Sequence, residues 1–473
     1  MYDPKSGEAS KFISHQEILS TIDYVDSNRE NRTLIDEVLA QAALGKGLTH
    51  RQAALLLECN DSEVVEQIFS LAAQIKERIY GRRVVIFAPL YLSNYCVNGC
   101  LYCPYRHSNK GSLRKRLSQE QIRQEVVALQ DMGHKRLVIE TGEDPINSPI
   151  EYVLESIETI YGVKHRNGAI RRVNVNIAAT TVENYRRLHQ AGIGTYTLFQ
   201  ETYHRESYRR LHPTGPKSDY DYHTQAMDRA MEGGVDDVGL GVLFGLNTYL
   251  YDFIGMMMHN HHLEERYGVG AHTISLPRIC PANGVDKGDY SDAISDELFS
   301  RIVAVARITL PYAGIIISTR ESQSVRERVL PLGVSQISGG SKTSVGGYSA
   351  PDSAQDDKSA QFDISDNRTL DDIVDWLVKL GYIPSFCTAC YREGRTGDRF
   401  AAMVKSGKIA ACCTPNALIT LKEYMEDYAS STTALHGAKL LLDEVGKITH
   451  PTLRRKTQES LTKIEEGSRD FRF

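Results

Sequence analysis

Between residues 82 and 340, eight short apolar runs alternate with segments of helical spacing, and this alternation constrains the fold more than any other feature. In chain order the runs are RVVIFAP, RLVIET, VNVNIAA, TYTLFQE, DVGLGVLFG, HTISLPRI, GIIISTRE and GVSQISGG. Segments between them, such as SQEQIRQEVVALQDMG, place apolar residues at helical intervals. Strands that alternate with helices form parallel sheets, and eight such strands close a TIM-type barrel. We therefore predict an α/β fold with a (β/α)8 barrel over residues 82–340; an open doubly wound sheet is the alternative.

Helical sequence flanks the predicted barrel on both sides. Residues 1–81 are expected to form an N-terminal helical extension, and its clearest helix begins at Asn60 as N-cap and ends at Gly81. A stretch rich in Gly, Ser and Asp, residues 341–369, is typical of a linker. Residues 370–473 are expected to form a mostly helical C-terminal domain, which carries a second group of cysteines.

Charge and cysteine content narrow the function classes. The net charge of -5 and the pI near 6.3 argue against a nucleic-acid-binding protein. The first residues lack the apolar centre of a secretory signal, and no apolar run is long enough to cross a membrane. We therefore expect a cytoplasmic protein that binds neither membranes nor nucleic acid. Its nine cysteines are odd in number and clustered, which favours metal ligation over a disulfide framework.

The first cysteine cluster lies in NYCVNGCLYCPYRH, directly after the first predicted strand. Active sites of such barrels lie at the C-terminal ends of the strands, so Cys96, Cys100 and Cys103 are placed at the expected site. Thiolates suit iron–sulfur clusters or zinc, but structural zinc sites use four ligands. A 4Fe–4S cluster held by three cysteines leaves one iron open for a small molecule. Zinc binding or chance clustering is the alternative.

The CxxxCxxC spacing, with the aromatic Tyr102 before its last cysteine, resembles the radical S-adenosylmethionine (SAM) superfamily. The resemblance implies that the open iron chelates SAM, which one electron from the cluster cleaves to methionine and a 5′-deoxyadenosyl radical. In VIETGEDP, at the end of the second strand, Thr141, Gly142 and Glu143 resemble the stretch that receives the SAM amino group. Alternatively, Glu143 is an ordinary loop carboxylate.

The fourth strand runs into FQETYHRESYRRLHPTGPKSDY, which places Glu201 and Tyr203 at the expected active-site mouth. This stretch, with HTISLPRI, IISTRES and VSQISGGSKTSVGGY, resembles the tyrosine lyases of the superfamily, the ThiH/HydG family. The resemblance implies cleavage of the Cα–Cβ bond of L-tyrosine to p-cresol and dehydroglycine. Arg320 is the first candidate to bind the tyrosine carboxylate and Arg278 the second, since a guanidinium matches a carboxylate in bidentate fashion. The alternative for each arginine is a salt bridge at the barrel mouth, for instance with Glu321.

The second cysteine cluster, in SFCTACYREGRTGDRFAAMVKSGKIAACC, resembles the HydG branch of the family, which differs from the ThiH branch in having this site. Cys387, Cys390 and Cys413 are the expected ligands, and Cys412 is the alternative to Cys413. The resemblance implies a second 4Fe–4S cluster with an additional labile iron and free cysteine as its ligand. Dehydroglycine would yield carbon monoxide and cyanide for the FeFe-hydrogenase cluster, and an electron donor and other hydrogenase maturases would be partners. A zinc knuckle is the alternative.

His272 opens the sixth strand, so we expect it near the N-terminal face of the barrel, opposite the SAM cluster. Residues at that face usually serve stability, and a packing histidine is one interpretation. The other is that His272 holds the labile iron, as the family resemblance implies. A strand of about seven residues spans roughly 23 Å, which would separate the two clusters by a barrel's height. Dehydroglycine would then move between them through the interior.

Overall fold

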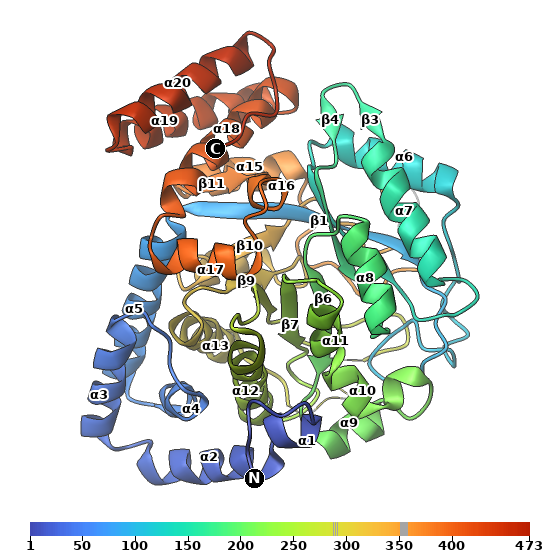
Figure 1. The fold of residues 1–473 in the computed structure, drawn as a ribbon, viewed down its shortest axis with the longest axis vertical. Helices are drawn as coiled ribbons and strands as arrows, with labels where there is room; N and C mark the ends of the chain where they lie inside the picture. Colours follow the sequence, from blue (N-terminus) through green and yellow to red (C-terminus); the bar gives the residue numbers. More distant parts are fainter. Residues whose placement is uncertain (287, 289, 291, 351–357) are drawn as a thin grey trace.

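The computed structural model describes residues 1–286, 288, 290, 292–350 and 358–473, and its centre is a closed barrel of eight parallel strands (Figure 1). Strand β10 closes the barrel by pairing with β1, at Ile337 and Ile86. The predicted TIM-type barrel is therefore confirmed, and the open sheet is excluded. The barrel strands are β1 (Arg83–Ser93), β2 (Arg136–Thr141), β5 (Arg172–Asn176), β6 (Tyr196–Glu201), β7 (Val238–Val242), β8 (Thr273–Ser275), β9 (Gly314–Ile317) and β10 (Val334–Ser338).

Helices surround the barrel, and their boundaries follow capping chemistry. Helix α6 begins after Ser118, whose side chain accepts a hydrogen bond from the backbone N–H of Gln121. The side chain of Gln121 accepts in return from the backbone N–H of Ser118. The larger connecting helices are α6 (Gln119–Asp131), α7 (Ile150–Gly162), α8 (Val182–Gln190), α11 (Ala226–Glu232), α12 (Tyr249–Tyr267), α13 (Asp296–Thr309) and α14 (Gln323–Val329). Shorter elements fill the remaining connections: the hairpin β3 (Lys164–His165) and β4 (Gly168–Ala169), α9 (Arg205–Leu211), η1 (Pro216–Ser218) and α10 (Tyr220–Thr224).

The N-terminal extension covers one side of the barrel. It comprises α1 (Ala9–Phe12), α2 (His15–Asn28), α3 (Arg32–Ala43), α4 (His50–Glu58) and α5 (Ser62–Tyr80). Helix α5 packs on α13, and α4 packs on α12 and α13. The cap of α5 is Asp61 and not Asn60, because the Asp61 carboxylate accepts from the backbone N–H groups of Glu63 and Val64. Gly81 ends the helix as expected, with a φ of 58° that favours glycine.

A strand that the sequence analysis did not predict fastens the C-terminal region to the barrel. Strand β11 (Ile383–Ser385) pairs in parallel with the first residues of β1, Arg83–Val85, whereas β2 pairs with β1 only from Ala88 onward. The C-terminal region therefore meets the barrel at the N-terminal ends of its strands. Its helices are α15 (Leu370–Lys379), α16 (Ala389–Arg392), α17 (Gly397–Lys405), α18 (Ala410–Asp427), α19 (Ser431–Lys447) and α20 (Pro451–Glu465).

The structure leaves the expected domain limits open. The divisions after residues 81, 340 and 369 stay predictions, and residues 351–357 of the expected linker lie outside the described residues. Among the described helices, none combines the length and the apolar character needed to cross a membrane.

Candidate functional site

A cavity of about 240 Å³, here called the first cavity, occupies the C-terminal end of the barrel. Cys96, Cys100 and Cys103, here called the first thiol triad, line its wall directly after β1. Burial raises the pKa of the Cys103 thiol to about 12 and also raises the pKa of Cys100. Thiols bind metals as thiolates, so this triad would release protons on binding a metal.

The loop that carries the first thiol triad is held against the end of β2. The backbone N–H of Val97 donates to the carbonyl of Glu143 at 2.8 Å. The side-chain amide of Asn98 donates to the Glu143 carboxylate at 2.6 Å and lies 3.7 Å from the sulfur of Cys96. Burial raises the pKa of Glu143. Asn98 thus connects the expected SAM-binding carboxylate to the expected cluster ligand.

Gly142 lies where the same two segments come closest. A Cβ at Gly142 would lie closer than 2.5 Å to the carbonyl oxygen of Tyr95, and 3.1 Å from the Cβ of Cys96. Thr141, Gly142 and Glu143 all line the first cavity. The glycine therefore allows β2 to end directly against the cysteine loop.

Tyr102 and Glu201 both belong to a small polar group on the cavity wall. Tyr102 pairs its hydroxyl with Nε2 of His212 at 2.7 Å, and Glu201 pairs with the ammonium of Lys217 at 2.8 Å. Lys217 lies 5.8 Å from the centre of the Tyr102 ring. Burial opposes the charge on Lys217, but Glu201 and the neighbouring thiols outweigh it, so that its pKa is raised. Glu201 has a φ of 68°, a left-handed conformation that is uncommon outside glycine and recurs at functional sites.

The two candidate arginines have different environments. Arg278 donates to Glu321 at 2.9 Å and to Asp296 at 2.9 Å, so it forms the mouth salt bridge that was its alternative interpretation. Arg320 lines the first cavity, and no ion pair to it occurs among the described residues. Its guanidinium donates to the sulfur of Cys280 at 3.2 Å. Arg320 is thus the arginine with donors left for a ligand.

Tyr203 does not line the first cavity, which corrects its assignment as a catalytic candidate. Its side chain is 1% exposed, and its ring packs against Gly255 of α12. Its hydroxyl pairs with Nδ1 of His259 at 2.9 Å, and its backbone N–H donates to Asp252 at 2.7 Å. The residue lies beyond the end of β6, where side chains pack under the covering helices.

Three residues of the first cavity were missed at the level of sequence: Asn98, Lys217 and Glu140. Asn98 lies inside the cysteine motif, and Glu140 directly precedes Thr141, so their positions in the two motifs were the available signals. Burial raises the pKa of Glu140 to about 8, although a hydrogen bond from Asn176 opposes the shift. Lys217 offered no comparable signal, because it lies in the short helix η1, 16 residues from its partner Glu201.

A second cavity of about 70 Å³ lies at the opposite, N-terminal end of the barrel. Cys387, Cys390 and Cys413, here called the second thiol triad, line it together with His272. Cys387 follows β11, Cys390 lies in α16 and Cys413 lies in α18. The pairing of β11 with β1 therefore brings the C-terminal cysteines to the barrel face where His272 directly precedes β8.

Cys413, and not its neighbour Cys412, lines the second cavity. The thiols of Cys390 and Cys413 share a hydrogen bond, which lowers the pKa of Cys413 and raises that of Cys390. Cys412 instead accepts from the guanidinium of Arg395 at 3.6 Å. The placement of the two adjacent thiols favours Cys413 as the third member of the triad.

His272 lies beside a buried carboxylate. Its Nδ1 lies 3.0 Å from Oδ1 of Asp237, and its ring lies 4.6 Å from that of Phe400. A carboxylate beside Nδ1 favours the proton on that nitrogen and leaves the lone pair of Nε2 free. Asp237 also accepts from the hydroxyl of Tyr391, so the same carboxylate connects His272 to the segment that carries the cysteines.

The two cavities approach each other inside the barrel. Gln336 lines both cavities. Arg136, in the wall of the second cavity, donates to the side-chain oxygen of Gln336 at 3.5 Å. Asn174 lines the first cavity and accepts from Arg172, which lines the second, at 2.7 Å. TIM-barrel interiors are usually filled by branched apolar side chains. Here polar side chains separate two cavities within one barrel.

Metal-ligating groups surround cavities and do not converge on a point. Within the described parts of the chain, no three His, Cys, Asp or Glu side chains come together closely enough to hold a single metal ion. Each thiol triad instead faces a space, in which different thiols can bind different irons of one cluster. Beside the second cavity, the buried Nε of Arg136 has no hydrogen-bond partner among the described residues. The residues present therefore fit an iron–sulfur cluster at each end of the barrel.

The barrel, with its cysteine loop at the C-terminal end, defines a radical SAM enzyme, and comparison with known proteins agrees. The Radical SAM superfamily model matches residues 90–257, and the Biotin and Thiamin Synthesis associated domain matches residues 275–383. This chain is 31% identical to 2-iminoacetate synthase of Escherichia coli K12 over 303 residues, which are 64% of this chain and 78% of that protein.

Two solved structures narrow the family. A crystal structure of HydG, described as a maturase of the [FeFe]-hydrogenase, is 50% identical, with a TM-score of 0.94, covering 98% of this chain and 100% of that one. The structure of the FeFe-hydrogenase maturase HydG from Carboxydothermus hydrogenoformans is 38% identical, with a TM-score of 0.83, covering 96% of this chain and 99% of that one. This chain belongs to the radical SAM family of HydG and 2-iminoacetate synthase.

Proposed function

We propose that this chain is a HydG-type tyrosine lyase that works at two iron–sulfur sites in succession. It would cleave L-tyrosine to p-cresol and dehydroglycine at the first cavity. At the second cavity it would convert dehydroglycine to carbon monoxide and cyanide, held as an iron complex with cysteine for the FeFe-hydrogenase cluster. The observation that carries the proposal is the presence of two thiol triads at opposite ends of one barrel.

In the first cavity, the first thiol triad would hold a 4Fe–4S cluster, and Tyr102, Thr141, Gly142 and Glu143 would surround SAM. The bound cluster, once reduced by an electron donor, and SAM would together supply a 5′-deoxyadenosyl radical. Glu143 is already oriented by Asn98 at 2.6 Å, so its carboxylate is placed to accept from an ammonium group.

Arg320 is the residue that we assign to the tyrosine carboxylate, because it faces the first cavity while Arg278 is paired elsewhere. The fixed fork of its guanidinium suits a carboxylate held in one orientation. Glu201, paired with Lys217 at 2.8 Å, would orient the polar groups of the substrate on the facing wall.

In the second cavity, the second thiol triad would hold another 4Fe–4S cluster, and Nε2 of His272 would bind the labile iron. The contact between Asp237 and Nδ1 supports this role, since iron-binding histidines usually direct their other nitrogen to a carboxylate or carbonyl. Dehydroglycine, a small polar product, would pass between the two cavities by way of the polar side chains around Gln336 that separate them. Other hydrogenase maturases are the expected recipients of the iron complex.

A second candidate function is that of a 2-iminoacetate synthase for thiazole formation, supported by the 31% identity to the Escherichia coli enzyme. Such an enzyme would release dehydroglycine and have no use for the second thiol triad. The position of that triad beside His272 favours the HydG-type function.

Anaerobic incubation of the reconstituted chain with SAM, tyrosine and dithionite tests the proposal. The HydG-type function predicts 5′-deoxyadenosine, p-cresol, carbon monoxide and cyanide. p-Cresol without carbon monoxide would favour the thiazole pathway, and the absence of 5′-deoxyadenosine would contradict both functions.

A further inference from the structure

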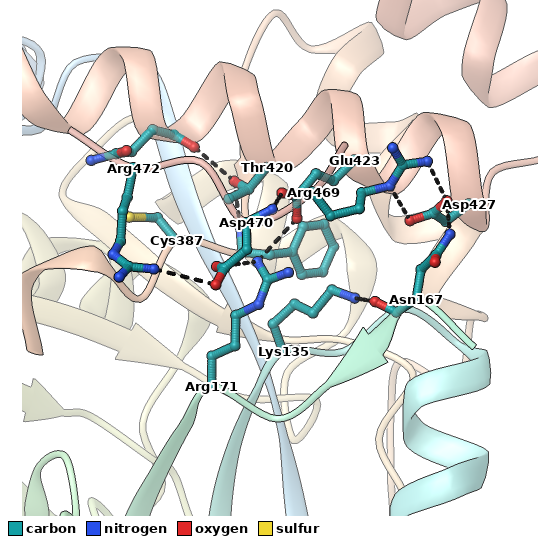
Figure 2. A network of polar contacts seen from close by, with 12 residues as sticks. Lys135, Asn167, Arg171, Cys387, Thr420, Glu423, Asp427, Arg469, Asp470 and Arg472 are labelled. Atoms are coloured by element: carbon teal, nitrogen blue, oxygen red, sulfur yellow. Dashed lines mark hydrogen bonds and ion pairs between the residues drawn. The ribbon is translucent and has the colours of Figure 1, made fainter. Parts of the chain in front are cut away.

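Residues 468–473, here called the strap, follow α20 and lie against the segments that carry the second thiol triad. Figure 2 shows Asp470 of the strap lying among Arg171, Glu423 and Arg472. The strap is largely polar, in the sequence SRDFRF, and its charged groups are all paired. It contacts both segments that carry the triad, and it contacts the barrel.

The first set of contacts reaches the segment of Cys387 and Cys390. Asp470 accepts from both terminal nitrogens of Arg392, at 2.5 and 2.7 Å. Arg472 donates to Glu393 at 2.6 Å. Arg392 and Glu393 follow Cys390 by two and three residues, so these ion pairs attach directly to the helix that carries this thiol.

Arg395 adds a link from the same segment to the strap and to the next helix. Its backbone N–H donates to the carbonyl of Cys390 at 2.7 Å. Its guanidinium donates to the backbone carbonyl of Phe473 and to the sulfur of Cys412. One arginine thus touches both cysteine-bearing segments and the strap.

The second set of contacts reaches α18, which carries Cys413. Asn416 exchanges two hydrogen bonds with the backbone of Phe473: it accepts from the N–H at 2.9 Å and donates to the carbonyl at 3.2 Å. The backbone N–H of Asp470 donates to Glu423 at 2.5 Å. Asn416 follows Cys413 by three residues, which is almost one helical turn. The strap therefore joins α18 close to its thiol.

The third set of contacts reaches the barrel through Arg171, which lies directly before β5. Arg171 donates to Glu423 at 3.0 Å and lies 3.3 Å from Asp470. The Glu423 side chain is 2% exposed and the Arg171 side chain 10% exposed. Removal of Asp470 would take one of its two anionic neighbours from Arg171 and would leave the guanidinium of Arg392 without either of these hydrogen bonds. The bend that brings Asp470 inward has a φ of 68°.

We propose that the strap is a positioning element for the second iron–sulfur site: Asp470 fixes the segment of Cys387 and Cys390 relative to the helix of Cys413. The proposal rests on the proposed function, because it assumes a cluster at the second thiol triad. Ligands are orientated by the groups around them, and loss of such groups typically weakens metal binding about 10- to 100-fold. The stacked rings of Phe386, directly after β11, and Tyr424 of α18 have their centroids 5.1 Å apart, so these two segments also touch without the strap.

The test uses the full chain with the first thiol triad replaced by alanine, so that bound iron reports the second site alone. The measured quantity is the retention of that iron. Asp470→Ala is expected to lose iron to a competing chelator at least about tenfold more readily. Arg392→Ala, which breaks the same ion pair from the other side, should show the same loss. Asp470→Glu keeps the charge and should restore retention, which a merely structural change would not explain. Glu459→Gln breaks an exposed pair with Arg455 on α20 and is the matched control, with no change expected.

The iron-free chain gives an independent measurement. Hydrogen exchange of residues 387–395 should accelerate in Asp470→Ala and Arg392→Ala, and stay unchanged in Glu459→Gln. Retention of iron by both strap variants at the level of the control would overturn the proposal. If instead Cys387→Ser combined with Cys390→Ser retains iron in this background, the second cluster itself is absent and the proposed function fails.

Discussion

Gly142→Ala is the substitution whose effect on the first site follows most directly from the coordinates. The added Cβ would lie closer than 2.5 Å to the carbonyl oxygen of Tyr95, whereas real Cβ atoms essentially never approach below 3.0 Å. The end of β2 and the cysteine loop must therefore separate by about 0.5 Å or more, and overpacking of this kind costs about 1 to 3 kcal/mol. The chain should remain folded. A misplacement of about 1 Å at reacting groups reduces rates by about 100-fold, so 5′-deoxyadenosine formation should fall by about 10- to 100-fold.

The assay is anaerobic 5′-deoxyadenosine formation with dithionite, measured beside thermal unfolding. Gly446→Ala is the control, because no atom lies within 4 Å of its Cβ position in α19. Gly446 lies in the last turn of α19, where alanine is a better helix former than glycine, so this variant should be at least as stable as the unmodified chain and fully active. Undiminished 5′-deoxyadenosine formation by Gly142→Ala would refute the argument that the close contact of these segments positions SAM.

Three further predictions concern other parts of the molecule. Replacing the first thiol triad with alanine should abolish 5′-deoxyadenosine and p-cresol together, and an unchanged p-cresol yield would contradict the assignment. His272→Ala should lose the labile iron, measured by iron analysis and electron paramagnetic resonance, while p-cresol formation continues. Asp366→Ala should lower the free energy of unfolding by about 3 to 5 kcal/mol, because it leaves the fully buried Arg326 unpaired. In the unmodified chain, burial would raise the pKa of Asp366, but Arg368 and Arg326 lower it below its ordinary value. The stabilisation by these ion pairs is therefore present above about pH 4 and is lost as the pH falls through the folded-state pKa. Urea titrations at a series of pH values measure this loss.

The barrel could be predicted from the sequence because its strands are short apolar runs of regular alternation. The eight predicted runs are the eight barrel strands, and the position of the cysteine motif after the first strand fixed its place at the C-terminal end. Strand β11 could not be predicted, since its three residues, IPS, carry no periodic pattern. It exists because β1 extends beyond the start of β2 and offers free backbone groups at Arg83–Val85.

The site could be predicted in part, and the differences have physical causes. Proximity in sequence to a strand end does not determine which way a side chain points, and for this reason Tyr203 packs under α12 although Glu201 lines the cavity. The choice between Arg278 and Arg320 depends on partners distant in sequence, Asp296 and Glu321, which only the folded chain brings near. No sequence motif pointed to the strap, because its contacts join residues that lie far apart in the sequence.

The ratio of carbon monoxide to p-cresol is the measurement that tests the central claim, namely that the two thiol triads act in succession. The comparison is between the unmodified chain and the variant Cys387→Ser with Cys390→Ser, each reconstituted and incubated with SAM, tyrosine and dithionite. If the triads act in succession, the variant forms p-cresol at a rate close to that of the unmodified chain, and its carbon monoxide falls sharply or disappears. A normal yield of carbon monoxide from the variant, or parallel loss of both products, would contradict the claim.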